Sequence, residues 1–136
     1  QTCAVVMLDI DHFKAVNDGF GHETGDQVLM AIGGILRGQF REGDAVARYG
    51  GEEFVACVAS AKSSELVGLC ERIRQAVGSH DWTRLASGLR VTVSVGASIH
   101  GDEPASLDAL ISRADIALYQ AKNQGRDRVV LYNQGP

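Results

Sequence analysis

The chain has 136 residues, a length that gives one domain of ordinary size with one hydrophobic core. Apolar residues make up 45% of the sequence, which is enough for such a core and excludes an intrinsically disordered protein. The 13 basic and 17 acidic side chains give a formal net charge of −4. This balance argues against a nucleic-acid partner bound through bulk positive charge, but it allows a small phosphorylated ligand bound together with a divalent cation.

The sequence carries no signal for a membrane or for secretion. No apolar run approaches the roughly 20 residues that span a bilayer, so we expect no direct membrane contact by this domain. Its cysteines, Cys3, Cys57 and Cys70, lack the C-x-x-C spacing of zinc or redox sites, and reduced thiols favour a cytoplasmic location. A strand-like run begins almost directly after Gln1, as in a piece of a longer protein. We therefore expect an upstream regulatory domain, and missing regions of the parent protein could anchor it to a membrane.

Hydrophobic periodicity divides the chain into strands and helices. Unbroken or alternating apolar runs predict strands, and apolar residues at helical spacing predict helices. In chain order, the predicted elements are a strand at 3–10, a helix at 12–17, a helix from Thr24 or Asp26 to about Phe40, strands at 44–49 and 54–59, a helix at 62–77, a strand at 91–99, a helix from Leu107 to Gly125 and a strand at 128–132. Asp11 is the expected N-cap of the first helix, a turn is predicted at 18–21, and loops are predicted at 79–88 and 100–105.

The predicted order of elements is βααββαβαβ. Two of the strands are joined by the short segment Gly50-Gly51-Glu52-Glu53, which is typical of a β-hairpin. A hairpin in the middle of the chain argues against a purely parallel, doubly wound sheet. We therefore predict an α/β (α+β) domain with a mixed, largely antiparallel central sheet and flanking helices.

Carboxylates occur at the end of a buried strand, at Asp9, and at the hairpin tip, at Glu52 and Glu53. Unpaired buried carboxylates are unfavourable, so a bound metal would explain their presence. Mg²⁺ or Mn²⁺ usually takes one or two carboxylates together with water and phosphate. Neighbouring residues of an extended strand point to opposite faces, and we favour Glu52 over Glu53 as the firmer partner of Asp9. Surface charges and helix caps would explain the same acids without a metal, and their spacing does not decide between the two.

Other candidate residues have an ordinary explanation when each is taken alone. The glycine-rich segment 19–25 lacks both the G-x-G-x-x-G spacing and a Walker lysine, so by itself it predicts a turn. Lys122 and Arg126 lie near the end of the last predicted helix, where cations offset the helix dipole as readily as they bind phosphate. Arg41 and Asp44 could form a simple surface ion pair.

Several motifs occur in a fixed order along nearly the whole chain. They are Asp9-Ile10-Asp11-His12-Phe13-Lys14-Ala15-Val16-Asn17-Asp18, Gly21-His22, Gly25-Asp26, Arg48-Tyr49-Gly50-Gly51-Glu52-Glu53-Phe54, Val91-Thr92-Val93-Ser94-Val95-Gly96, Arg113-Ala114-Asp115, Ala117-Leu118-Tyr119-Gln120-Ala121-Lys122 and Gly125-Arg126. Together they resemble a GGDEF domain, the domain of bacterial diguanylate cyclases. The resemblance implies a fold like the palm of class III nucleotide cyclases, and condensation of two GTP into cyclic di-GMP with release of pyrophosphate. It also implies that residues 1–136 form a single GGDEF domain without the family's usual N-terminal segment, D-x-L-T-x-L-x-N-R.

The resemblance implies a role for each matching residue. Two Mg²⁺ or Mn²⁺ ions per half-site would bind Asp9, the carbonyl of Ile10 and Glu52, with Glu53 assisting. A general base, either Glu52 or a metal-bound hydroxide, would take the proton of the ribose 3′-hydroxyl. The implied nucleotide contacts are Asn17 and Asp26 at the guanine, His22 in the same loop, Gly50 and Gly51 at the hairpin, and Lys14, Lys122 and Arg126 with the backbone near Phe13 at the triphosphate. Lys14 is counted with Glu52 and Glu53 among the catalytic residues.

The resemblance further implies partners and regulation. Each domain of the family binds one GTP, so two half-sites must face each other in a homodimer. The pattern Arg41-Glu42-Gly43-Asp44 matches the R-x-x-D site at which the product cyclic di-GMP inhibits such enzymes, with Arg72 or Arg74 from the following helix.

Two other interpretations remain open at this point. One is a catalytically silent GGDEF module that senses GTP or cyclic di-GMP, and the intact signature counts against it. The other is an adenylyl or guanylyl cyclase with a 3′,5′-monocyclic product, and the guanine-reading pair and the R-x-x-D pattern count against that.

Overall fold

The computed structural model describes residues 3–59, 62–101 and 105–133. In chain order, the elements are β1 (Cys3–Ile10), α1 (Phe13–Phe20), α2 (His22–Gln39), β2 (Ala45–Gly50), β3 (Glu53–Ala59), α3 (Ser63–Ser79), the short 3-10 helix η1 (Trp82–Arg84), β4 (Val93–Ile99), α4 (Leu107–Asn123) and β5 (Val129–Leu131). Apart from η1, this is the predicted order.

The strands form one five-stranded sheet in the order β2-β3-β1-β4-β5. β1 pairs antiparallel with both β3 and β4, and β2 pairs antiparallel with β3, whereas β4 and β5 run parallel. The predicted mixed, largely antiparallel sheet is therefore confirmed. β1 is the central strand and its side chains are buried on both faces of the sheet, which explains why its apolar run is unbroken.

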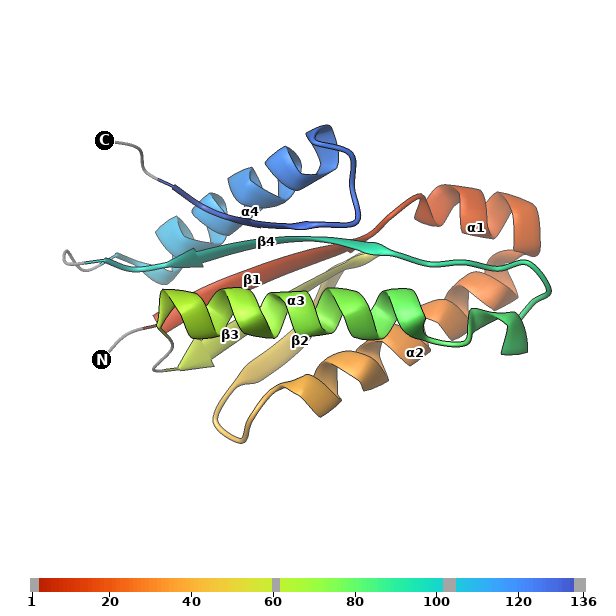
Figure 1. Ribbon diagram of the computed structural model, residues 1–136, viewed down its shortest axis with the longest axis horizontal. Coiled ribbons are helices and arrows are strands. Elements are labelled where there is room, and N and C mark those ends of the chain that lie inside the picture. Colours follow the sequence, from red (N-terminus) through yellow and green to blue (C-terminus); the bar gives the residue numbers. More distant parts are fainter. Residues whose placement is uncertain (1–2, 60–61, 102–104, 134–136) are drawn as a thin grey trace.

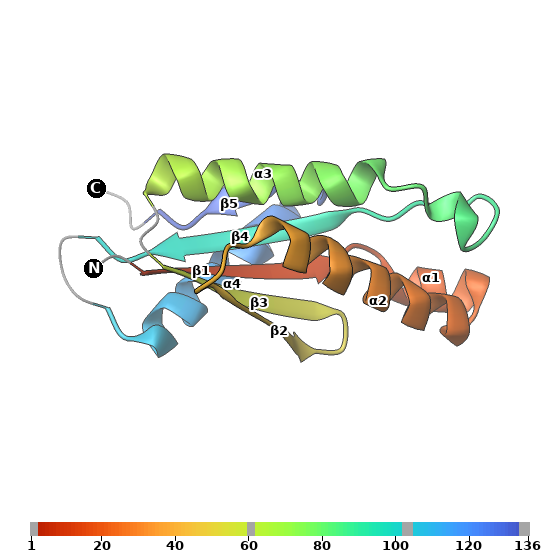
Figure 2. The same cartoon turned by 90° about the horizontal axis from the view of Figure 1, so that it is seen from below.

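Helices cover both faces of the sheet, with α2 and α3 on one side and α4 on the other (Figures 1 and 2). The larger core lies under α2 and α3 and includes Val6, Leu8 and Phe54. A smaller core lies under α4 and includes Val5 and Met7. Successive side chains of β1 thus enter opposite layers, as the pleat of a strand requires.

The connection between the first two helices is shorter than predicted. α1 continues to Phe20 and α2 begins at His22, not at Thr24 or Asp26. Gly21 alone joins them, with φ of +96°, a conformation that glycine adopts without a side-chain penalty. The glycine-rich segment therefore places α1 and α2 directly against each other.

The predicted N-cap of α1 is wrong. His12 occupies the N-cap position in the left-handed conformation, with φ of +55°, and no side chain in the described part of the chain caps α1. The carboxylate of Asp11 instead bonds to residues near β4 and β5, as described below.

The predicted loop at 79–88 contains η1. Trp82 is buried there, and its Nε1 donates a hydrogen bond to the carbonyl of Val77 at 2.8 Å. This bond closes the end of the core under α3.

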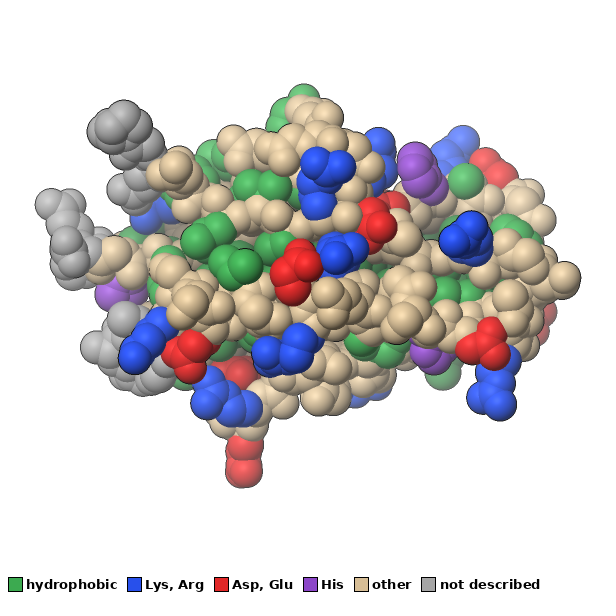
Figure 3. All heavy atoms as spheres, viewed as in Figure 1, with side chains coloured by type: hydrophobic (Ala, Val, Ile, Leu, Met, Phe, Trp, Pro, Cys, Tyr) green, Lys and Arg blue, Asp and Glu red, His purple; other side chains and the backbone are tan. Residues whose placement is uncertain are grey.

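The surface agrees with the near balance of charges. Figure 3 shows acidic and basic side chains interspersed over the face that carries α3, without a continuous basic patch. Among the helices described, none is long and apolar enough to cross a bilayer.

Candidate active site

Two acidic residues meet at the end of the central strand. The antiparallel register of β1 and β3 sets Asp9 directly opposite Glu53. Directly opposite residues of an antiparallel pair present their side chains to the same face, so the two carboxylates are close neighbours. Glu52, which the sequence favoured as the partner of Asp9, contacts the same strand end through its backbone, where its carbonyl accepts a hydrogen bond from the amide of Ile10 at 3.3 Å.

The electrostatics of this pair favour a bound cation. Burial raises the pKa of Asp9, although a hydrogen bond from Lys122 opposes the rise. Burial also raises the pKa of Glu53, and the charge of Asp9 adds to the effect. The ionised carboxylates are thus under-compensated, and a positive charge placed between them would be stabilised.

Two cationic residues approach Asp9 from the far end of the chain. Lys122, in the last turn of α4, forms an ion pair with Asp9 through its Nζ. Arg126 follows α4, and its charge lowers the pKa of Asp9. The structure thus brings together an acid pair and two of the three cations that the sequence predicted to bind phosphate.

The residues present fit a hard divalent cation. In the ranges that the structure describes, no group of three or more His, Cys, Asp or Glu side chains forms a complete metal site. Asp9 and Glu53 nevertheless supply two carboxylates, which is the usual protein contribution to a Mg²⁺ site that water and substrate phosphate complete. Asp9, Glu53 and, by prediction, the Ile10 carbonyl and Glu52 would hold it.

The hairpin tip between β2 and β3 is fixed by an arginine. Arg48 donates from its Nε to the carbonyl of Gly51 at 2.9 Å, and Gly51 has φ of +47°. A Cβ atom built at Gly50 would meet no atom within 4 Å, so the fold of this chain leaves room for a side chain at position 50. The sequence alone predicts no role for Arg48, although it begins the motif Arg48-Tyr49-Gly50-Gly51-Glu52-Glu53-Phe54.

The predicted guanine-reading residues, Asn17 and Asp26, lie on the two helices α1 and α2, which pack against each other. A Cβ atom at Gly25 would lie 1.8 Å from Oδ1 of Asn17 and 3.3 Å from Cζ of Phe13. The side chain of Asn17 therefore packs against the backbone of α2 at Gly25, the residue that precedes Asp26. His22, the first residue of α2, is exposed nearby along the same helix.

Among the three cations predicted to bind the triphosphate, Lys14 is the one for which the structure shows no interaction with the acids Asp9 and Glu53. Its side chain is 91% exposed and pairs with Asp18 at 3.6 Å, one turn further along α1. Its proposed contact with the triphosphate stays a prediction.

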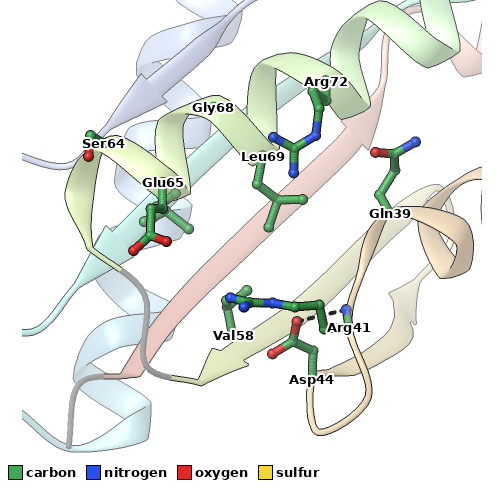
Figure 4. A pocket seen from close by; sticks show the side chains of 10 residues that line it. Gln39, Arg41, Asp44, Val58, Ser64, Glu65, Gly68, Leu69 and Arg72 are labelled. Carbon is green, nitrogen blue, oxygen red and sulfur yellow. Dashed lines mark hydrogen bonds between the residues drawn. The ribbon is translucent and has the colours of Figure 1, made fainter.

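The R-x-x-D pattern lines a pocket on the face between α3 and the start of β2 (Figure 4). Arg41, Asp44 and Arg72 line this pocket, which has a volume of about 330 Å³. Asp44 accepts hydrogen bonds from the backbone amides of Arg41 at 3.0 Å and Ala59 at 3.1 Å, and these bonds fix its carboxylate. Of the two arginines left open by the sequence, the structure brings Arg72 to this pocket.

Arg74, the alternative to Arg72, lies elsewhere. It donates hydrogen bonds to both carboxylate oxygens of Glu71, at 3.2 and 3.0 Å, and to Asp127 at 3.1 Å. These bonds direct Arg74 toward β5 and not toward the pocket that contains Arg41.

Comparison with known proteins identifies the class. The sequence profile described as "Diguanylate cyclase, GGDEF domain" matches residues 1–128, and the chain belongs to this family. The active GGEEF domain of a diguanylate cyclase from Vibrio cholerae superposes with a TM-score of 0.92 at 30% identity, over 99% of this chain and 85% of that one. The fold is therefore the cyclase-palm-like fold that the resemblance implied.

Two further relatives support this assignment. The GGDEF domain of DgcB from Caulobacter crescentus, solved in complex with c-di-GMP, has a TM-score of 0.87 at 34% identity and covers 96% of this chain and 78% of that one. Diguanylate cyclase A of Treponema denticola is 38% identical over 131 residues, which are 96% of this chain and 35% of that protein. The chain thus spans about a third of the length of this relative.

Proposed function

We propose that this chain is a diguanylate cyclase domain that joins two molecules of GTP into cyclic di-GMP. The observation that carries the proposal is the meeting of Asp9 and Glu53 across β1 and β3, beside Lys122 and Arg126. An acid pair next to cations suits a metal-bound triphosphate. The relatives that are diguanylate cyclases support the same reaction.

The bonds that form and break are the same in both halves of the reaction. The ribose 3′-oxygen of one GTP forms a bond to the α-phosphorus of the other, while the bond from that phosphorus to the pyrophosphate oxygen breaks. The proton of the hydroxyl passes to a base, and Glu52 is our candidate. When bound, two Mg²⁺ or Mn²⁺ ions per half-site would acidify the hydroxyl and neutralise the leaving pyrophosphate.

The remaining residues bind and orient the nucleotide. Asn17 and Asp26 offer an amide and a carboxylate to the guanine, with Phe13 and His22 beside them. Lys14, Lys122 and Arg126 contact the triphosphate, and Gly50 and Gly51 let the hairpin approach it closely.

Two chains are needed for the complete reaction, because each holds a single GTP. A homodimer with two-fold symmetry places each 3′-hydroxyl opposite the partner's α-phosphate, so that both bonds form in one arrangement. The pocket that contains Arg41, Asp44 and Arg72 binds cyclic di-GMP, and the bound product inhibits the enzyme. We also propose an upstream regulatory domain and a cytoplasmic location.

The test is to incubate the purified chain with GTP and Mg²⁺ or Mn²⁺ over a series of protein concentrations. We expect cyclic di-GMP and pyrophosphate by mass spectrometry, with a specific activity that rises with protein concentration. Asp9→Asn is expected to lower turnover by about 100-fold or more, because it removes a metal ligand that acts on the transition state. Asp108→Asn, an exposed acid in the first turn of α4, is the matched control.

Binding measurements separate this proposal from the alternative. If cyclic di-GMP or GTP binds tightly and no product forms at any protein concentration, the chain is a silent sensory module. A monocyclic nucleotide as the product would contradict both interpretations.

A further inference from the structure

A buried carboxylate next to the candidate site has no role in the mechanism above. Asp11 lies two residues after Asp9 and is 6% exposed. Its Oδ1 accepts a hydrogen bond from Oγ of Ser94 at 2.6 Å, and its Oδ2 accepts from Oγ1 of Thr92 at 2.7 Å and from the backbone amide of Asp127 at 3.0 Å. These three donors take most of the roughly four acceptor positions of a carboxylate, so Asp11 serves as a structural anchor for the segments around it.

The last of these bonds holds a strained turn. Arg126 and Asp127 both have positive φ, at +64° and +47°, although neither is glycine. Such conformations are unfavourable and persist only where the surroundings impose them. Here the amide of Arg126 bonds to the carbonyl of Ala121 at 3.0 Å, and the amide of Asp127 bonds to Asp11.

A second contact holds the same turn from the opposite helix. Arg74 of α3 donates from Nη1 to the Asp127 carboxylate at 3.1 Å, and its other guanidinium nitrogens bond to Glu71. Asp127 is thus held by its backbone from Asp11, which directly follows β1, and by its side chain from α3. This double hold fixes the direction in which the preceding residue, Arg126, leaves the backbone.

We propose that Asp11 and Arg74 are positioning residues that hold the strained turn at Asp127 and thereby aim Arg126 at the nucleotide triphosphate. This inference rests on the proposed function, because it takes Arg126 to bind phosphate near Asp9. It also gives Arg74 a role at the catalytic end of the molecule, away from the product pocket.

The test uses 3′-deoxy-GTP with Mg²⁺, a ligand that lacks the attacking hydroxyl and therefore reports binding without turnover. We expect Arg126→Ala to weaken its binding by about 10-fold or more, and Asp11→Ala by about 10-fold. In the Arg126→Ala background, Asp11→Ala should cost less than about 2-fold, because the residue that it positions is gone. An equal loss in both backgrounds would show a general structural role and overturn the inference.

Conservative and matched variants separate positioning from folding. Asp11→Asn keeps an acceptor oxygen for the Asp127 amide and should bind within about 3-fold of the unaltered chain. Ser94→Ala removes a bond to the other carboxylate oxygen and should not weaken nucleotide binding. If Ser94→Ala weakened nucleotide binding as much as Asp11→Ala does, the inference would be contradicted.

Arg74 offers a second variant. Replacing it leaves no buried unpaired charge, because the side chains of its partners Glu71 and Asp127 are 39% and 48% exposed. Arg74→Ala should weaken binding by about 3-fold, and only while Arg126 is present. Arg84→Ala removes an exposed arginine that pairs with Asp81 and serves as the control. If Arg74→Ala binds as the unaltered chain does, the hold from α3 plays no part and the inference is overturned.

Hydrogen exchange in the nucleotide-free protein tests the turn directly. Asp11→Ala and Arg74→Ala should both accelerate exchange of the Asp127 amide, whereas Ser94→Ala should not. Unchanged exchange of this amide in both variants would overturn the inference about Asp11 and Arg74 and would leave the proposed function standing. If the unaltered chain failed to bind 3′-deoxy-GTP, the proposed function would fall, and this inference with it.

Discussion

At the residue scale, the candidate site concentrates like charges in a partly buried place. Burial raises the pKa of Asp9 and of Glu53, and the charge of Asp9 further raises the pKa of Glu53. Lys122 compensates Asp9 in part through an ion pair. Such an arrangement lowers the stability of the fold, and a bound cation with its phosphate ligand would recover it.

Gly25 is a residue whose missing side chain matters to the site. A Cβ atom there would overlap Oδ1 of Asn17 at 1.8 Å, so Gly25→Ala must displace the amide that we assign to guanine recognition. We expect the KM for GTP to rise about 10-fold and the preference for GTP over ATP to fall, because one base contact is lost. Gly19→Ala, where a Cβ atom would meet nothing within 4 Å, is the control. An unchanged base preference in Gly25→Ala would contradict the assignment of Asn17.

Cys70 gives a pH dependence that is independent of the catalytic site. Burial raises the pKa of its thiol from 9.0 to about 12, so the thiol ionises in the unfolded chain well before it does so in the folded protein. Its contribution to stability is complete below about pH 9 and is lost as the pH rises toward 12.

The variant Cys70→Ala tests this effect. Between about pH 8 and pH 10, the unaltered chain should lose roughly 1 kcal/mol more free energy of unfolding than Cys70→Ala does. Urea unfolding at both pH values measures the difference, and the comparison of losses cancels the packing defect that the variant has at every pH. Equal losses would show that the thiol is accessible to water in the folded protein.

At the element scale, the site is assembled by strand register and by the docking of α4. The β1–β3 register brings Asp9 to Glu53, and a shift of one residue would turn one of them to the opposite face of the sheet. α4 carries Lys122, and it lies close to the sheet because β4 has a glycine, Gly96, at the point of contact. A Cβ atom at Gly96 would lie 2.2 Å from the backbone nitrogen of Leu118 and 2.3 Å from the carbonyl oxygen of Ala114.

Gly96→Ala should therefore push α4 away from the sheet. These neighbours are backbone atoms of a helix and cannot rotate aside, so we expect a destabilisation of about 3 kcal/mol or more in chemical unfolding. Gly34→Ala, within α2 and with open space around its Cβ position, should be neutral or stabilising by roughly 0.5 kcal/mol. If Gly96→Ala were as stable as the unaltered chain, the close packing of α4 on β4 would be contradicted.

At the scale of the whole molecule, two candidate ligand sites are connected by the β2–β3 hairpin. Asp44 stands just before β2 and lines the pocket that we propose for the product, while the far end of the hairpin carries Gly50, Gly51, Glu52 and Glu53. A ligand that draws α3 and the start of β2 together would therefore act on the β2–β3 hairpin, whose other end lies at the candidate active site.

Arg41→Ala tests the assignment of that pocket. The variant removes a guanidinium suited to phosphate and guanine, so the concentration of cyclic di-GMP that halves activity should rise by about 10-fold or more. Initial rates at increasing concentrations of added product give this value, with Arg84→Ala as the control for loss of an exposed arginine. Unchanged inhibition in Arg41→Ala would move the product site elsewhere.

The sequence determined the class of fold, because apolar periodicity and the hairpin glycines are local signals that the elements keep. It also determined the chemical types of the site residues, because the motifs that carry them follow one another along the chain in the same order as in the GGDEF family. Tertiary structure decided which of these residues meet. The register set Glu53 opposite Asp9, and the packing of α3 placed Arg72 in the pocket with Arg41 and Asp44 and directed Arg74 toward Asp127.

Asp11 shows why the sequence could not decide such questions. At a strand end before a short helix, an aspartate is a reasonable N-cap by local rules. In the folded chain its partners are Thr92, Ser94 and Asp127, more than 80 residues away, and they outcompete the helix for its carboxylate. Local propensity sees only neighbours along the chain, whereas hydrogen bonds between distant segments exist only after the sheet has formed.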